Sequence, residues 1–209
     1  MNVLVIAPHP DDECLGCGGT VLLHLQQGDK VSVVYLTSGE LGLKKLPKEF
    51  AWQTREAEAR AACTILGIPE PLFLRLPDWT MGDDIAAAAT ALRPVLEQTR
   101  PKLVYLPHPA EWHPDHRAVL PILKSAFHGI SIGAPLLRGY EVWTPMAEFQ
   151  HVENISGVME KKLAALKAHT SQIADWDYVR AIRGLNAYRG VMAGRCDYSE
   201  VFQELLPAP

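Results

Sequence analysis

The sequence is poor in the features that mark several classes of protein. Four cysteines among 209 residues are too few for a disulfide framework, so we expect free thiols. The longest apolar stretches, such as the alanine-rich segment 85–92, fall well short of the about 20 residues that a transmembrane helix needs. The first residues, MNVLVIAPHPDD, have neither the positive charge nor the apolar length of a signal peptide. We therefore expect a cytoplasmic protein that does not use a membrane.

Basic clusters are also missing. The net charge is −4 and the pI is about 6.1, so a nucleic-acid partner is not expected. There is no internal repeat and no low-complexity segment, and 48% of the residues are hydrophobic. A chain of this length and composition predicts one domain, 1–209, with one sizeable core.

Short apolar runs alternate with helical patterns through most of the chain. Five runs have the length and composition of buried strands: Asn2–Ala7, Val31–Thr37, Leu72–Leu76, Leu103–Leu106 and Leu137–Val142. Five segments have helical periodicity: Gly19–Gln27, Glu49–Leu66, Asp84–Gln98, Asp115–Phe127 and Gly157–Ala168. This alternation predicts an α/β fold that is Rossmann-like, with a mostly parallel sheet, helices on both faces and a helical C-terminal tail.

Residue types at the segment ends support these boundaries. Gly67 follows the second helical segment and is a natural C-cap. Asp83 or Asp84 precedes the third and is a natural N-cap. Pro114 stands where a proline favours the first turn of a helix.

Two polar clusters follow predicted strands. The stretch VIAPHPDDECLGCGG (5–19) ends the first strand, and HPAEWHPDH (108–116) comes just after the strand 103–106. In open α/β sheets the ligand site lies beyond the carboxyl ends of the strands. The two clusters can therefore face one another at one edge of the sheet.

The residue types in these clusters are those of a divalent metal site. A catalytic zinc typically has three protein ligands and one open position. His9, one of the adjacent aspartates and one or both of His113 and His116 would supply that number. The competing interpretation is that HPDD is only a helix N-cap, because aspartate often starts helices.

The motifs resemble those of the LmbE-like, or PIG-L, family of zinc-dependent deacetylases of N-acetylglucosamine (GlcNAc) conjugates. The resemblance is carried by APHPDDE at 7–13, LGCGG at 15–19 and HPDH at 113–116, with weaker matches in TSGE (37–40), REAEARAACTILG (55–67), LRLPD (74–78) and KLAALKAHTSQ (162–172). It covers nearly the whole chain. The departures are Pro8 directly before His9, Glu111 where many relatives carry Asp, and Trp79 where the family often has Gly.

The resemblance implies a role for each matching residue in the metal centre. His9, Asp12 and His116 would bind zinc, with iron(II) as a possible alternative. Asp11 would act as general base on the attacking water. Such a metal would lower the pKa of bound water toward ~7, and a neighbouring carboxylate would accept its proton.

The resemblance also assigns residues around the substrate. His113 would face the developing oxyanion, as a charged stabiliser or general acid, and Asp115 would orient a histidine, with His113 itself as a candidate. Arg55 and Asp78 match positions that hold sugar hydroxyls. The implied partner is a small-molecule GlcNAc conjugate, and the implied assembly is a homo-oligomer.

Other functions fit parts of the sequence. Cys14 and Cys17 form a C-x-x-C that would suit a thiol–disulfide redox protein, although buried cysteines are more often packing residues. Two histidines and one carboxylate also form the triad of non-haem iron oxygenases. A deacetylase fold acting on another amide, or a catalytically inactive sugar-binding protein, are further alternatives.

Overall fold

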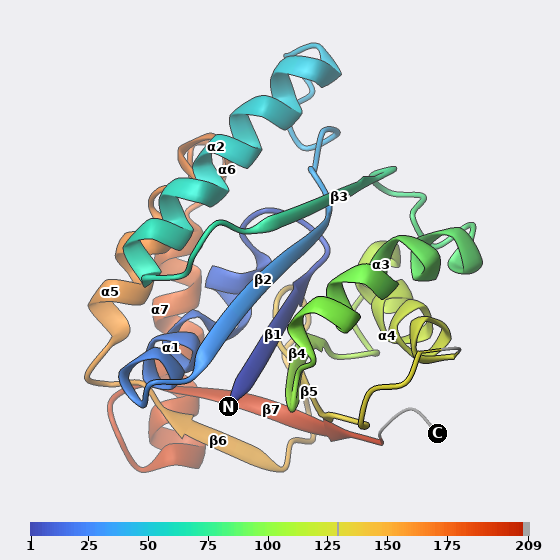
Figure 1. Cartoon of the computed structure of the whole chain (residues 1–209). Helices are drawn as coiled ribbons and strands as arrows, with labels where there is room; N and C mark the ends of the chain where they lie inside the picture. Colours follow the sequence, from blue (N-terminus) through green and yellow to red (C-terminus); the bar gives the residue numbers. More distant parts are fainter. Residues whose placement is uncertain (129, 207–209) are drawn as a thin grey trace.

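The structure, a computed structural model, describes residues 1–128 and 130–206, so residue 129 and the last three residues of the predicted domain lie outside the described part. Figure 1 shows one sheet with helices on either side. The strands are β1 (Asn2–Ala7), β2 (Lys30–Thr37), β3 (Leu72–Leu76), β4 (Leu103–Pro107), β5 (Leu136–Tyr140), β6 (His151–Asn154) and β7 (Ser199–Leu205). The helices are α1 (Asp12–Gln26), α2 (Lys48–Leu66), α3 (Ile85–Thr99), α4 (Pro114–Phe127), α5 (Met159–Leu166), α6 (Thr170–Ile173), α7 (Tyr178–Arg189) and the π-helix η1 (Gly190–Gly194). Within the described residues, no helix combines the length and apolar character needed to cross a bilayer.

The sheet confirms the predicted fold class. Its strand order is β3-β2-β1-β4-β5-β7-β6. The first five strands are parallel, while β7 runs antiparallel to both β5 and β6. The chain moves outward from β1 in one direction and from β4 in the other, so β1 and β4 flank a topological switch point, where such sheets bind ligands.

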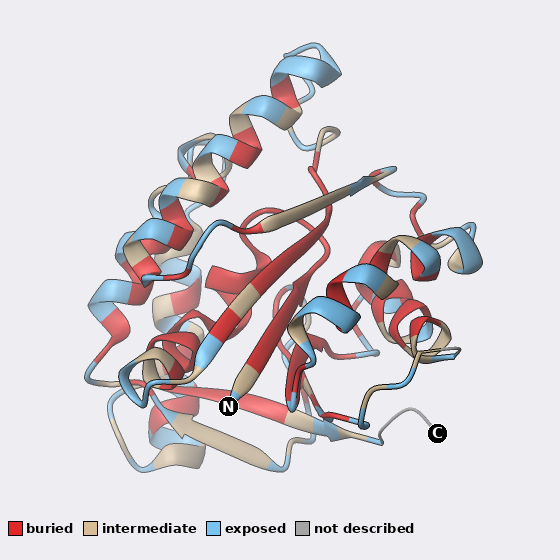
Figure 2. Ribbon diagram, viewed as in Figure 1, coloured by how far each residue is buried: buried red, intermediate tan, exposed pale blue. Residues whose placement is uncertain are grey.

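Two apolar cores lie on opposite faces of the sheet. Side chains alternate along each strand, so Val3 and Val5 of β1 join one core while Leu4 and Ile6 join the other. Helices α1, α2, α5 and α7 cover the first face, and α3 and α4 cover the second. The central strands are buried on both sides, and α1 is buried along most of its length, whereas α2, α3 and α4 expose their outer faces (Figure 2).

The helix ends follow the predicted signals. Gly67 ends α2 in the left-handed conformation, with φ of 91°. The Asp84 carboxylate caps α3 by accepting a 2.9 Å hydrogen bond from Ala87 N–H. Pro114 is the first residue of α4, with His113 at its N-cap.

Helix α1 begins at Asp12, earlier than the start predicted at Gly19, and it breaks at Cys17, where φ is −142°. The break frees backbone groups that the buried Lys162 and Glu200 satisfy. Lys162 Nζ donates to Leu15 C=O over 3.0 Å, and the Glu200 carboxylate accepts from Gly19 N–H over 2.8 Å. The single turn before the break presents the HPDD segment at the sheet edge.

The segment after residue 143 is not purely helical. The predicted helix Gly157–Ala168 corresponds to the shorter α5, and the same region adds β6, β7, α6 and α7. Strands β6 and β7 pair antiparallel, and their sequences, HVEN and SEVFQEL, are rich in polar residues, so they lack the apolar runs that reveal the parallel strands. The predicted strand at 137–142 forms as β5, two residues shorter at its end.

Candidate active site

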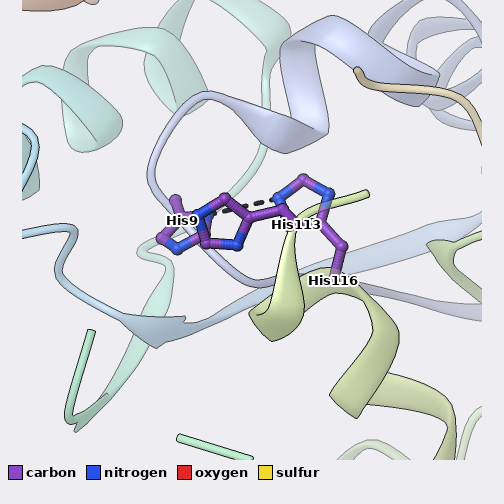
Figure 3. A group of neighbouring side chains, drawn as sticks. All are labelled: His9, His113 and His116. Atoms are coloured by element: carbon purple, nitrogen blue, oxygen red, sulfur yellow. Dashed lines mark hydrogen bonds between the residues drawn. The ribbon is translucent and has the colours of Figure 1, made fainter. Parts of the chain in front are cut away.

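The loops that follow β1 and β4 meet at the switch point. The first loop carries His9 and leads into α1, and the second carries His113 at the start of α4. Figure 3 shows His9, His113 and His116 turned toward one another from these two segments. The two polar clusters therefore face each other, as the sequence predicted, and they line a cavity of about 380 Å³.

Three potential ligand atoms form an even triangle. His9 Nδ1, Asp12 Oδ2 and His116 Nε2 lie 3.3 Å from one another along all three edges. Tetrahedral coordination with bonds of about 2.0–2.1 Å places neighbouring ligand atoms about 3.3 Å apart. The three side chains are buried, and two neutral imidazoles with one carboxylate suit a divalent cation. These residues therefore fit a metal ion.

Neighbouring groups would allow variants of this ligand set. His113 lies close enough to His9 and His116 to form a second possible trio, and Asp78 and Asp115 form a third trio with His9. Ligand atoms in these sets lie within 4.8 Å of one another, a looser limit than the 3.3 Å edges of the His9–Asp12–His116 triangle. All three sets share His9.

The adjacent aspartates point to different partners. Burial would raise the pKa of Asp12, but the charges and hydrogen bonds of His116 and His9 hold it well below its ordinary value. The pKa of Asp11 is raised to about 6: burial raises it most, the charge of Arg55 opposes the rise, and the charge of Asp12 adds to it. Asp11 Oδ2 lies 3.2 Å from Arg55 Nη2. The two carboxylates thus have separate environments and separate acidities.

Asp11 occupies the N-cap position of α1 without acting as a cap. Its φ is 125°, in a region that favours glycine, and its side chain makes no capping hydrogen bond. Its backbone N–H donates instead to Glu13 Oε2 over 3.2 Å. Strained residues of this kind cluster at functional sites, and the Asp11 carboxylate lines the cavity. The helix-cap interpretation of HPDD therefore does not account for Asp11.

His113 and Asp115 differ from the prediction in one respect. The Asp115 carboxylate does not hold the His113 ring: its Oδ2 lies 3.1 Å from His9 Nε2 and accepts a 2.8 Å bond from Trp79 N–H. His113 Nδ1 instead accepts from Asp115 N–H over 3.2 Å. The histidine that Asp115 orients is therefore His9.

The protonation expected for His113 also changes. Burial, together with the charges of His9 and His116, lowers the pKa of His113 to about 4. Because Nδ1 accepts a hydrogen bond, the proton of the neutral ring belongs on Nε2. His113 is therefore a neutral donor in this environment, rather than the charged group that the sequence suggested.

Arg55 and Asp78 line the cavity, but most of their polar atoms already have protein partners. Arg55 donates to the carbonyl oxygens of Pro10 and Gly39, and Asp78 Oδ2 accepts from Leu41 N–H over 2.9 Å. Asp78 Oδ1 lies 3.2 Å from His9 Nε2, and Arg55 Nε is a buried atom without a hydrogen-bond partner. These two residues hold the loops of the site together.

Cys14 and Cys17 are free and buried, and burial raises the pKa of both thiols well above the ordinary value. Thiol–disulfide chemistry needs an accessible thiolate, so the redox interpretation has no structural support. Cys14 Sγ lies 3.1 Å from Glu13 Oε1, in packed surroundings.

Some residues around the site were not found from the sequence. His169 Nε2 lies 3.4 Å from Glu13 Oε1, and the other oxygen of Glu13 accepts from Asp11 N–H, so His169 contacts the carboxylate that holds the Asp11 backbone. Trp112, Trp143 and Trp176 line the cavity. The aromatic residues carry no spacing signal, because they lie on separate loops.

Comparisons with known proteins agree with this geometry. The model of the family described as "PIG-L: GlcNAc-PI de-N-acetylase" matches residues 4–127. A probable N-acetyl-alpha-D-glucosaminyl L-malate deacetylase 2 from Bacillus cereus is 30% identical over 183 residues, which cover 82% of this chain and 83% of the relative. A diacetylchitobiose deacetylase from Thermococcus kodakarensis is 32% identical, covering 92% of this chain and 79% of the relative.

A solved structure shares the fold. The N,N'-diacetylchitobiose deacetylase from Pyrococcus horikoshii superimposes with a TM-score of 0.84, covering 97% of this chain and 83% of the other, at 24% identity. The family match spans β1 to the end of α4 and so includes both motif-bearing loops. The motifs, the family match and these relatives together show that the chain belongs to the PIG-L family.

Proposed function

We propose that this protein is a metal-dependent hydrolase that removes the acetyl group from a GlcNAc-containing small molecule. The observation that carries the proposal is the triangle of ligand atoms from His9, Asp12 and His116, with edges of 3.3 Å. The adjacent residue, Asp11, has a carboxylate that makes no helix-capping hydrogen bond. The named activities of the Bacillus and Thermococcus relatives support the reaction. The cytoplasmic location and homo-oligomeric state expected from the sequence belong to the same proposal.

His9, Asp12 and His116 would hold the metal, which we propose to be zinc, with iron(II) as the alternative. When bound, it would supply Lewis acidity for the amide carbonyl and make a bound water more acidic. The Asp115 carboxylate fixes the orientation of His9 from its other ring nitrogen. This arrangement leaves His9 Nδ1 facing Asp12 and His116.

Asp11 is the proposed general base. Its pKa of about 6 lets the carboxylate accept a proton from the attacking water near neutral pH and return it to the leaving amine. Arg55 holds this carboxylate in position. His113, with a pKa of about 4, is a weak base that would not hold this proton near neutral pH. We therefore assign both proton transfers to Asp11.

His113 is the proposed oxyanion donor. Nucleophilic attack places negative charge on the former carbonyl oxygen, and a fixed N–H directed at that oxygen stabilises the transition state. His113 would donate from Nε2. Arg55 and Asp78, which line the cavity, would contact hydroxyl groups of the sugar.

The test is a mass-spectrometric screen of N-acetylated sugar conjugates for the loss of one acetyl group. Protein loaded with zinc or iron(II) should release acetate from at least one GlcNAc conjugate, and chelation should abolish the release. The exposed Asp83 offers a matched control, since Asp83→Asn leaves the site intact. A metal-loaded protein with no turnover on any GlcNAc conjugate would contradict the proposal.

A further inference from the structure

Four of the five tryptophans in the chain surround the mouth of the active-site cavity. Trp79, Trp112, Trp143 and Trp176 all line it, and their exposed fractions are 48%, 54%, 36% and 68%. Large aromatic side chains gain free energy when they are buried. Four exposed indoles at one opening therefore indicate a surface that a ligand covers.

Three of the indoles form a continuous arc that starts at the reactive centre. The ring centroids of Trp79 and Trp112 lie 4.4 and 5.4 Å from that of His113. The arc continues from Trp112 to Trp143 over 6.4 Å and from Trp143 to Tyr178 over 5.4 Å. A substrate with its acetamide beside His113 would therefore place its remaining part against aromatic surface.

The backbones that carry the arc are fixed. The backbone N–H of Trp79, a residue with φ of 70°, donates to Asp115 Oδ2. The N–H of Trp112 donates to Thr144 Oγ1, and the N–H of Trp143 donates to the Glu111 carboxylate. The indoles thus project from backbone segments that hydrogen bonds hold in place, which limits the conformational entropy lost when a ligand binds.

The charge of the cavity lining argues against an anionic ligand. Among the described residues that line it, Asp11, Asp12 and Asp78 carry negative charge, and the single guanidinium is that of Arg55. Arg55 is buried and bonded to two carbonyl oxygens and Asp11. A dipositive metal would bring this lining only to neutrality, and the faces of aromatic rings are themselves electron-rich.

We propose that the arc binds an uncharged saccharide aglycone, a second pyranose ring whose apolar face stacks on the indoles. This inference rests on the proposed deacetylase function and names its substrate class. A pyranose offers C–H groups to the ring faces and hydroxyls to water, so stacking buries apolar surface without burying charge. A carboxylate-bearing aglycone would meet electron-rich faces without a free cation in the described lining.

The experiment compares kcat/KM for three substrates: methyl β-GlcNAc, N,N'-diacetylchitobiose and the GlcNAc–malate conjugate. The disaccharide should exceed the methyl glycoside by about tenfold, as the stacking of one ring implies, while the malate conjugate should not exceed it. Trp112→Ala and Trp143→Ala should each reduce the disaccharide's advantage several-fold, mainly through KM. Trp52, the tryptophan outside this cavity, provides the control: Trp52→Ala should preserve the ratio.

A charge insertion gives an independent readout. Gln172 lines the cavity, and Gln172→Lys should raise kcat/KM for the malate conjugate relative to the disaccharide. Turnover of the methyl glycoside without any advantage for the disaccharide would overturn the inference while leaving the deacetylase function intact. Preference for malate, or for a disaccharide whose second ring carries a free ammonium, would overturn it too. Loss of turnover on all substrates would instead count against the deacetylase function itself.

Discussion

The carboxylate of Asp115 lies 3.1 Å from Nε2 of His9, although 106 residues separate them in the chain. Both residues are buried. His9 lies in the loop after β1 and Asp115 in the first turn of α4, which follows β4, and β1 and β4 pair as neighbouring strands. The contact joins the two halves of the proposed metal site through the ring nitrogen of His9 that does not face Asp12 and His116. It sets the direction in which His9 presents Nδ1 to a metal.

Replacing this carboxylate should weaken metal binding. Asp115→Asn keeps a group that can accept from Trp79 N–H but removes one of the two carboxylates beside His9 Nε2, the other being that of Asp78. Loss of a carboxylate that orients a metal-bound histidine typically lowers metal affinity by about 10–100-fold. Competition with a chelating dye would measure this, with Asp83→Asn as the control. Equal affinity in the two variants would contradict the orienting role.

Asp11 and Asp12 should respond differently to substitution. Asp11→Asn should keep the metal and lose about 10²–10⁴-fold in rate, because the amide cannot accept a proton. Asp12→Ala should lose both metal and activity, because the carboxylate forms one corner of the ligand triangle. Metal content and turnover measured on the same preparations would decide. If Asp11→Asn lost the metal while Asp12→Ala retained it, the two roles would be reversed.

His113 should act as a neutral hydrogen-bond donor. His113→Ala should lower kcat by about 10²–10³-fold, the typical cost of removing one oxyanion donor, and leave the metal in place. His113→Gln supplies a neutral N–H and should recover part of the loss. Steady-state kinetics with metal analysis would test both variants. A glutamine variant as inactive as the alanine variant would indicate that charge at this position is needed.

The buried pair of Lys162 and Glu200 should matter for stability. Lys162 Nζ lies 2.7 Å from Glu200 Oε1, and both side chains are almost fully buried. Lys162→Met leaves the Glu200 carboxylate buried without its cation, which typically costs about 3–5 kcal/mol. Urea unfolding would measure the loss, with the exposed Lys161→Met as control. Equal midpoints for the two variants would show that the pair is dispensable.

Glu56 should contribute to stability in a pH-dependent way. Burial would raise its pKa, but hydrogen bonds from Arg75 and Ser38 hold the pKa below the ordinary value. A pKa lower in the folded than in the unfolded chain stabilises the protein above the unfolded value of about 4.3, and this stability is lost as the pH falls through the folded pKa.

The matching variant is Glu56→Gln. Its deficit in unfolding free energy relative to the unmodified protein should be constant above about pH 5 and shrink below about pH 4.3. Unfolding curves across this range would show it, and the exposed Glu97→Gln should show no such trend. A deficit that grows toward acid would contradict the assignment.

Elements whose signals are local could be predicted from the amino-acid order alone. The apolar runs of β1, β2 and β4 are nearly continuous because these strands are buried on both faces, and Gly67 and Asp84 mark helix ends through their own backbone and side-chain chemistry. The two motif-bearing segments could be located once these strands were predicted, because ligand sites lie beyond the carboxyl ends of parallel strands.

Which groups meet within the site depends instead on contacts that form when the chain folds. The partner of Asp115, the neutral state of His113 and the burial of Lys162 depend on contacts between segments far apart in the chain. Strands β6 and β7 are defined by pairing with each other and with β5, not by an apolar run. The tryptophan arc is another feature that depends on tertiary contacts. Its members lie on separate loops, and their proximity follows from the sheet that brings those loops to one edge.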